Sequence, residues 1–159
     1  MYQEGDSIQD FTLPGTNAAG EEVDLTLSSL LQGRDYTILY FYPRDNTPGC
    51  TTEACDFRDN LKLISPKANV VGCSPDKPAT HQKFREKQSL NFPLISDMEK
   101  KLMAQFGAFG EKKNYGKIVQ GVIRSTFILD GQGTLLKAMR NIKAKGHVER
   151  ILKELEALN

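Results

Sequence analysis

The stretch "YTILYFYPRDNTPGCTTEAC", residues 36–55, decides the fold. Its first seven residues are an almost unbroken aromatic and β-branched run, which is typical of a strand covered on both faces in a parallel sheet. Pro43 ends this run, and Thr47 then takes the N-cap position of a helix with Pro48 in the first turn. The sequence therefore predicts a central strand that leads through a short loop into a helix.

The chain that follows predicts a strand–helix–strand unit. The helix ends by Pro66, and its apolar residues recur at helical spacing: Ala54, Phe57, Leu61 and Ile64. A second short apolar strand, "NVVGCSPD", occupies residues 69–76. This order favours a right-handed crossover between two parallel strands.

Further elements extend the unit in both directions. We expect a helix from about Pro78, a final helix from about His147 and an edge strand within residues 20–27. Residues 122–140 predict two strands joined by a turn at Asp130–Gly131. This order of elements indicates an α/β protein with a thioredoxin-like fold, in which helices flank a central mixed β-sheet.

Residues 96–107, "SDMEKKLMAQFG", predict one more helix. Ser96 and Glu99 have the spacing of a capping box, and Gly107 is a typical stop. We expect an inward stripe formed by Met98, Leu102 and Phe106.

Composition limits the classes of function. The 159 residues, 39% of them hydrophobic, suit one domain spanning residues 1–159. With 21 basic and 20 acidic residues and no basic stripe, neither nucleic acid nor a membrane surface is an expected partner. The acidic start "MYQEGDSIQDF" is unlike a signal peptide, and no run approaches the ~20 apolar residues of a membrane span. We therefore expect a cytoplasmic protein.

Cys50 has the features of a nucleophile. It falls in the first turn of the predicted helix, at the carboxyl end of a parallel strand, where sites in such sheets usually lie. Unpaired amide groups and the partial positive charge of the helix N-terminus favour a thiolate over a thiol. Cys55 lies more than one turn later and needs no such activation if it attacks an oxidised Cys50.

The spacing of these cysteines sets a geometric limit. Five residues of α-helix rise about 7.5 Å along the axis. A disulfide needs Cα atoms within roughly 4.4–6.8 Å, so the two residues cannot bridge within one intact helix. We therefore expect the first turn and a half of the helix to unwind when Cys50 is oxidised.

The cysteines and histidines also have other conceivable roles. A free cysteine is often a small buried hydrophobe, but the cap, proline and glycine around Cys50 favour chemistry. A zinc site is disfavoured, because there is no C-x-x-C pair and only His81 and His147 could complete a ligand set. We expect both histidines at exposed or capping positions.

The motif "PRDNTPGCTTEAC" resembles the peroxiredoxins and, within them, the bacterioferritin comigratory protein (PrxQ) group. The resemblance extends over nearly the whole chain, through "GDSIQDFTLPG", "FGEKKNYGK", "GVIRSTFILDGQG" and "KAKGHVERIL". It implies a peroxiredoxin variant of the thioredoxin-like fold. It also implies a thiol-dependent peroxidase that acts on hydrogen peroxide and organic hydroperoxides.

The resemblance assigns roles to particular residues. Cys50 would be the peroxidatic thiolate and Cys55 the resolving thiol that forms an intramolecular disulfide with it. Three residues would complete the site. Arg124 would stabilise negative charge, Thr47 would orient the peroxide while capping the helix, and Pro43 would shield the thiolate from water. Glu53 matches the family's acid that orients an arginine, although a carboxylate in a first helical turn is also explained by the helix dipole.

The resemblance further implies recycling by thioredoxin or a related dithiol protein, without haem, flavin or metal. Members of the group are often monomeric, so we expect a monomer. Cys73 departs from the family, whose residue at this strand position is commonly aliphatic; core packing is the expectation, with an accessory thiol as the alternative.

Two other functions remain open from sequence. A thiol–disulfide oxidoreductase would share the fold but would normally use C-x-x-C. A redox-sensing or chaperone-like protein would use the cysteines only to switch conformation. Sustained peroxide turnover distinguishes an enzyme from such a sensor.

Overall fold

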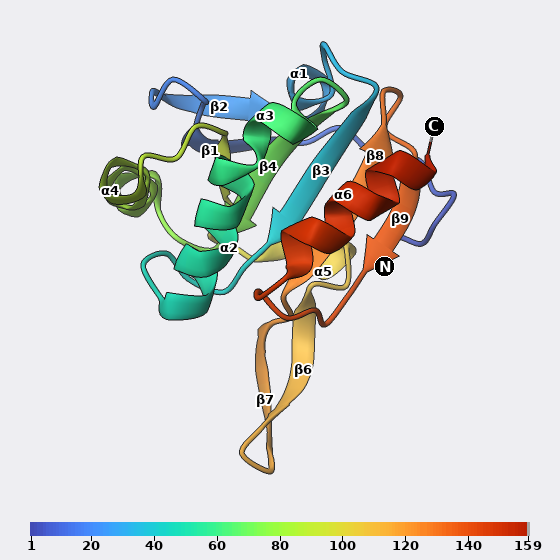
Figure 1. Cartoon of the computed structure of the whole chain (residues 1–159). Helices are drawn as coiled ribbons and strands as arrows, with labels where there is room; N and C mark the ends of the chain where they lie inside the picture. The colour runs from blue at the N-terminus through green and yellow to red at the C-terminus, as the bar shows by residue number, and fades with distance from the viewer. Residues whose placement is uncertain (159) are drawn as a thin grey trace.

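The computed structural model describes residues 1–158, except for the side chain of Asn114. It contains a seven-stranded sheet in the order β2-β1-β5-β4-β3-β8-β9 and a separate two-stranded hairpin, β6-β7 (Figure 1). The strands are β1 (Thr12–Thr16), β2 (Glu22–Thr26), β3 (Tyr36–Phe41), β4 (Ala68–Ser74), β5 (Leu94–Ser96), β6 (Phe109–Asn114), β7 (Lys117–Val122), β8 (Ser125–Asp130) and β9 (Leu135–Met139). The helices are α1 (Leu27–Leu30), α2 (Pro48–Asp59), α3 (Leu61–Ile64), α4 (Pro78–Gln88), α5 (Lys101–Gln105) and α6 (His147–Ala157).

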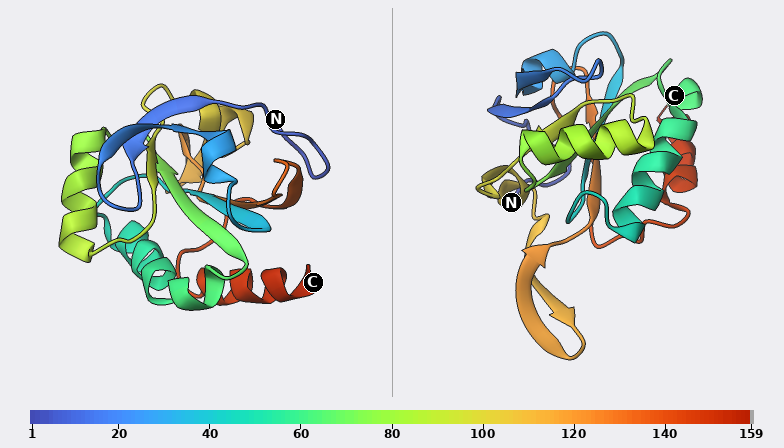
Figure 2. Two further views of the ribbon diagram at one scale, coloured as in Figure 1. Left: turned by 90° about the horizontal axis from the view of Figure 1, so that it is seen from above. Right: turned by 90° about the vertical axis from the view of Figure 1, so that its left-hand side faces the viewer.

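The sheet confirms the expected α/β class. Strand β3 pairs in parallel with β4 and antiparallel with β8, so the sheet is mixed and β3 lies inside it. Two hydrophobic clusters cover its faces: α2, α3, α4 and α6 pack on one face, and α1 and α5 on the other (Figure 2). Burial on both faces explains why the sequence of β3 is continuously apolar instead of alternating.

Several predicted elements are confirmed. Helix α4 begins at Pro78, α6 begins at His147, and β2 is an edge strand. The turn after Asp130 joins β8 to β9. Within residues 1–158, none of the helices is long and apolar enough to cross a membrane.

The predicted capping box is wrong. Ser96 ends strand β5, where it pairs with Ser74, so it cannot cap a helix that begins only at Lys101. The carboxylate of Asp97 instead accepts hydrogen bonds from the backbone amides of Leu102 and Met103. Because the helix starts late, Met98 precedes it and is exposed, while Leu102 and Phe106 are buried as expected.

The helix after β3 is also shorter than expected. It ends at Asp59, and a break at Asn60 separates it from the single turn of α3. Thr47 occupies the N-cap position, but its side chain makes no capping bond. Its hydroxyl instead donates to the carbonyl oxygen of Arg44 at 2.8 Å. The predicted start of this helix is confirmed, whereas the predicted capping bond of Thr47 is wrong.

Both histidines contradict the expectation of exposed or capping positions. His81 is fully buried between the loop after β3 and strand β5. His147 does begin α6, but its ring is buried and its Nε2 lies 2.8 Å from Thr126 Oγ1. Burial and the positive charge of Arg150 and Arg124 lower the pKa of His147 from 6.5 to about 4, so the ring is neutral at pH 7.

Strands β1 and β5 and the hairpin β6-β7 were not predicted from the sequence. This hairpin extends away from the body of the molecule (Figures 1 and 2). Tyr115 at its tip is 99% exposed. The root of the hairpin leads directly to Arg124, which precedes β8.

Candidate active site

Cys50 lies at the carboxyl end of the parallel strands. Strand β3 ends at Phe41, a loop follows, and α2 begins at Pro48, so Cys50 is the third helical residue. Its side chain is 2% exposed and packs with the apolar cluster under α2. The position agrees with the sequence prediction: a thiol at a helix N-terminus, shielded from bulk water.

The side chain of Arg124 joins this thiol to Glu53. Its Nη2 donates to Cys50 Sγ at 3.2 Å, and its Nη1 donates to Glu53 Oε1 at 2.6 Å. A Cβ atom on Gly49 would lie 3.3 Å from Nη2, so the glycine leaves room for the guanidinium. Arg124 and Cys50 are 74 residues apart in the sequence, and the fold brings the guanidinium into contact with the sulfur.

Glu53 is a carboxyl group buried with an incomplete set of partners. Its side chain has no exposed surface, and within residues 1–158 its Oε2 has no hydrogen-bond partner. Burial raises the pKa of Glu53 from 4.5 to about 7, and the positive charge of Arg124 opposes that rise. Burial disfavours the charged form of Arg124, yet Glu53 and Cys50 outweigh it and raise the pKa of the guanidinium. Arg124 therefore keeps its charge beside the sulfur.

Pro43 and Thr47 frame the loop that leads into α2, and both are half-buried. The bond from Thr47 to Arg44 closes a turn within this loop. Asn46, between Asp45 and Thr47, has a φ of 62°, in the left-handed region that asparagine tolerates better than most residues. The structure thus brings the predicted loop residues and Cys50 into one continuous segment.

Cys55 lies on the same helix as Cys50, which is unbroken from Pro48 to Asp59. Its thiol is partly buried and donates to Gln88 Oε1, at the end of α4, over 3.5 Å. All three cysteines, which lie within the described residues, are free thiols. In this form of the protein, five residues of intact helix therefore separate Cys50 from Cys55, which is too far for a disulfide.

Cys73 is fully buried on β4, where it pairs with Phe41 of β3. Burial, together with the negative charge of Asp97, raises the pKa of this thiol well above its usual range. Core packing, the expected role, agrees with both observations, and the thiol has no exposed surface through which to exchange.

A buried group around Asp45 was missed by the sequence analysis. His81 Nδ1 lies 2.6 Å from Asp45 Oδ2, and its Nε2 lies 2.9 Å from the carbonyl oxygen of Ile95. Asp76 offers a third potential ligand atom within 4.8 Å of the other two. Both ring nitrogens of His81 are occupied by hydrogen bonds, so the ring offers no free lone pair to a metal. The only sequence signal was the polarity of three residues at separate loop and helix positions.

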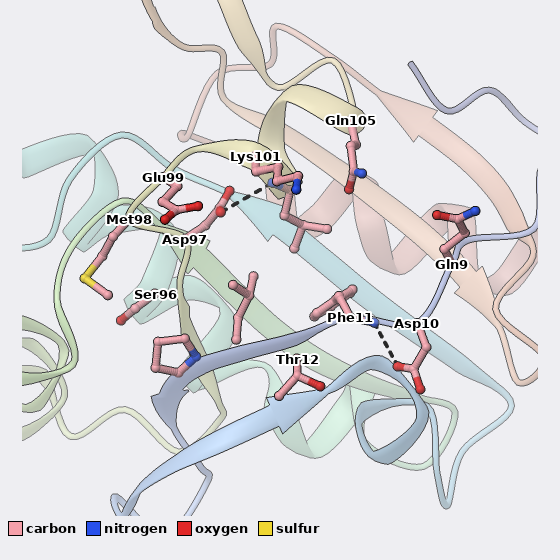
Figure 3. A pocket seen from close by; sticks show the side chains of 13 residues that line it. Gln9, Asp10, Phe11, Thr12, Ser96, Asp97, Met98, Glu99, Lys101 and Gln105 are labelled. Atoms are coloured by element: carbon pink, nitrogen blue, oxygen red, sulfur yellow. Dashed lines mark hydrogen bonds between the residues drawn. The ribbon is translucent and has the colours of Figure 1, made fainter.

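A cavity lies elsewhere in the molecule. It has a volume of about 410 Å³ and lies between the N-terminal segment 9–14 and the segment 96–105 (Figure 3). Its lining combines apolar side chains such as Phe11 and Leu102 with the carboxylate of Asp97. None of the site residues predicted from the sequence lines it.

The buried carboxyl group makes stability depend on pH. Glu53 has a pKa raised from 4.5 to about 7 on folding, so the stability it contributes below pH 4.5 is lost as pH rises through 7. Relative to the Glu53→Gln variant, the wild-type free energy of unfolding should fall by about 3 kcal/mol between about pH 4.5 and pH 8. Urea unfolding of both proteins across this range measures the difference. Parallel pH dependences would contradict the raised pKa.

The chain is similar to known proteins over nearly its whole length. The model of the AhpC/TSA family matches residues 5–138. Peroxiredoxin Bcp of Bacillus subtilis is 44% identical over 156 residues, which cover 98% of this chain and 96% of that protein. Peroxiredoxin Bcp of Escherichia coli is 39% identical over 153 residues, covering 96% and 94%.

Solved structures are also similar to this chain. The bacterioferritin comigratory protein of Xanthomonas campestris superposes with a TM-score of 0.81 at 38% identity, covering 91% of this chain and 90% of that one. A cysteine-to-serine mutant of Xylella fastidiosa PrxQ gives 0.85 at 34% identity, covering 99% and 97%. The fold is therefore the thioredoxin-like fold of these proteins. The chain belongs to the AhpC/TSA family and, within it, to the peroxiredoxins of the bacterioferritin comigratory protein (PrxQ) group, which are thiol peroxidases.

Proposed function

We propose that the chain reduces hydrogen peroxide and organic hydroperoxides with Cys50 as the peroxidatic residue. The observation that carries this proposal is the guanidinium of Arg124, which donates to both Cys50 Sγ and Glu53 Oε1. A fixed positive charge beside a sulfur at a helix N-terminus favours the nucleophilic thiolate. The related protein of Xanthomonas campestris was studied for alkyl peroxide reduction, which supports including organic hydroperoxides.

In the first step the thiolate of Cys50 attacks the terminal oxygen of ROOH. The S–O bond forms as the O–O bond breaks, and the leaving alkoxide takes a proton to give ROH, or water when R is hydrogen. Sulfur is oxidised to the sulfenic acid and the peroxide is reduced. Arg124 is placed to stabilise the negative charge that spreads over the oxygens, since its fork of N–H donors is fixed by Glu53.

Thr47 and Pro43 have supporting roles in this proposal. In the structure the hydroxyl of Thr47 donates to the carbonyl oxygen of Arg44. The same hydroxyl oxygen can still accept a hydrogen bond from the peroxide. Pro43 has no backbone N–H and limits the access of water to the thiolate. Both roles depend on the position of the loop that these two residues frame.

In the second step Cys55 attacks the sulfenic acid, and a disulfide and water form. A dithiol protein, which we propose to be thioredoxin, then reduces the disulfide and is itself oxidised. In each cycle two electrons pass from the dithiol protein, through Cys50 and Cys55, to one peroxide. No further cofactor is therefore part of the proposal. We propose that the protein acts as a monomer in the cytoplasm, where its three free thiols fit a reducing compartment.

A coupled assay tests the function. NADPH consumption with thioredoxin, thioredoxin reductase and hydrogen peroxide should be sustained for the wild type and absent for Cys50→Ser. The rate of NADPH consumption by Cys55→Ser should be roughly tenfold lower than that of the wild type, because no intramolecular disulfide forms. Cys73→Ala is the matched control and should retain turnover, since that thiol is buried away from solvent. Consumption that stops after one equivalent of peroxide would indicate a redox sensor instead of an enzyme.

The second step also predicts a change of conformation. Because Cys50 and Cys55 are five residues apart in an unbroken helix, the disulfide requires the start of α2 to unwind. Amide hydrogen exchange of residues 50–58 should be faster in the disulfide form than in the reduced form. Helix α6, which lacks cysteine, serves as the internal reference. Equally slow exchange of residues 50–58 in both forms would rule out this unwinding.

A further inference from the structure

Asp45 belongs to the active-site loop, and we call the group of residues bonded around it the loop anchor: Tyr42, Asp45, Asp76 and His81. The hydroxyl of Tyr42 donates to Asp45 Oδ1 at 2.6 Å, and His81 Nδ1 lies 2.6 Å from Asp45 Oδ2. The backbone amide of Asp45 donates to Asp76 Oδ2 at 2.7 Å. Asp45 is thus held through its backbone and through both carboxylate oxygens.

His81 and Asp45 share a proton, as the partners of the two ring nitrogens show. The carbonyl oxygen of Ile95 can only accept, so His81 Nε2 must donate to it. The second proton of the pair then lies between Nδ1 and Asp45 Oδ2, whichever atom carries it. The side chains of both residues have no exposed surface, so water does not compete for this bond.

The anchor ties the loop to the sheet. His81 belongs to α4, and through Nε2 it is fixed to Ile95 of strand β5. Through Nδ1 it fixes Asp45, which lies between Pro43 and Thr47. Asn46, whose φ of 62° lies in the left-handed region, follows Asp45 directly.

We propose that His81, acting through Asp45, is a positioning residue of the peroxidase reaction. It touches neither Cys50 nor the peroxide, but it holds the loop that carries Pro43 and Thr47 beside the thiolate. This inference rests on the proposed function, because it assigns those two residues a part in the reaction of Cys50. When the bond to Asp45 is lost, the loop loses its fixed position and Cys50 reacts more slowly with peroxide.

Two substitutions at His81 separate the two bonds of the ring. The side-chain amide of His81→Asn places an N–H near the position of Nδ1 and keeps a donor for Asp45. The longer side chain of His81→Gln places its N–H near the position of Nε2, keeps the bond to Ile95 and leaves Asp45 Oδ2 without a donor. Both are neutral, and both remove the ring, so they form a matched pair.

Stopped-flow oxidation of Cys50 by hydrogen peroxide gives the second-order rate constant of the first step. We expect His81→Asn to remain within threefold of the wild type and His81→Gln to lose at least tenfold, both measured on protein shown to be folded by urea titration. Wild-type rates for folded His81→Gln, or equal losses in the two variants, would overturn the proposal. If His81→Gln does not fold, Tyr42→Phe replaces it, since this change removes one donor to the same carboxylate. The rate constant of Tyr42→Phe should fall at least threefold below that of the wild type. An unchanged rate constant would overturn the proposal.

Amide hydrogen exchange of residues 44–47 measures the loop without peroxide. It should be faster in His81→Gln than in His81→Asn, and equal exchange would contradict the anchor itself. A wild-type protein that does not react with peroxide would contradict the proposed function, while the exchange comparison would still decide whether His81 holds the loop. The two failures are therefore distinguishable.

Discussion

The contact of one guanidinium with a sulfur and a carboxylate is the interaction on which the site depends. Arg124 contacts Cys50 and Glu53 at once. Arg124 directly precedes β8, and the other two residues lie on two successive turns of α2. Burying Glu53 is unfavourable, as its raised pKa shows, and the arginine opposes that cost.

The fold supplies this contact because parallel strands end at one edge of the sheet. Strand β3 leads to the loop and to Cys50, and its antiparallel neighbour β8 begins beside Phe41, so that Arg124 reaches the same edge. The buried bonds of Asp45 fix the intervening loop to α4 and β5. In our account, rigid surroundings present the thiolate, while the first turns of α2 remain able to unwind.

The predictions that succeeded used local information. The continuous apolar run of β3, the proline at the start of α2 and the spacing of Val148, Ile151 and Leu155 in α6 each depend on neighbours in sequence, and these elements formed as expected. The predictions that failed depended on distant partners. Ser96 is paired in a strand with Ser74, and His81 is buried by Asp45 and Ile95, contacts that no spacing within a helix announces. Arg124 was identified only through the family resemblance, since a lone arginine before a strand is otherwise an ordinary surface residue.

We propose that Arg124 activates Cys50 and stabilises the charge formed as the peroxide bond breaks. The most direct measurement is the second-order rate constant for oxidation of Cys50 by hydrogen peroxide in Arg124→Lys, which keeps a positive charge near Glu53 but loses the fork of donors. We predict a loss of roughly hundredfold in a folded variant, the size expected when a donor to a developing oxyanion is removed. A rate constant equal to that of the wild type would contradict the account.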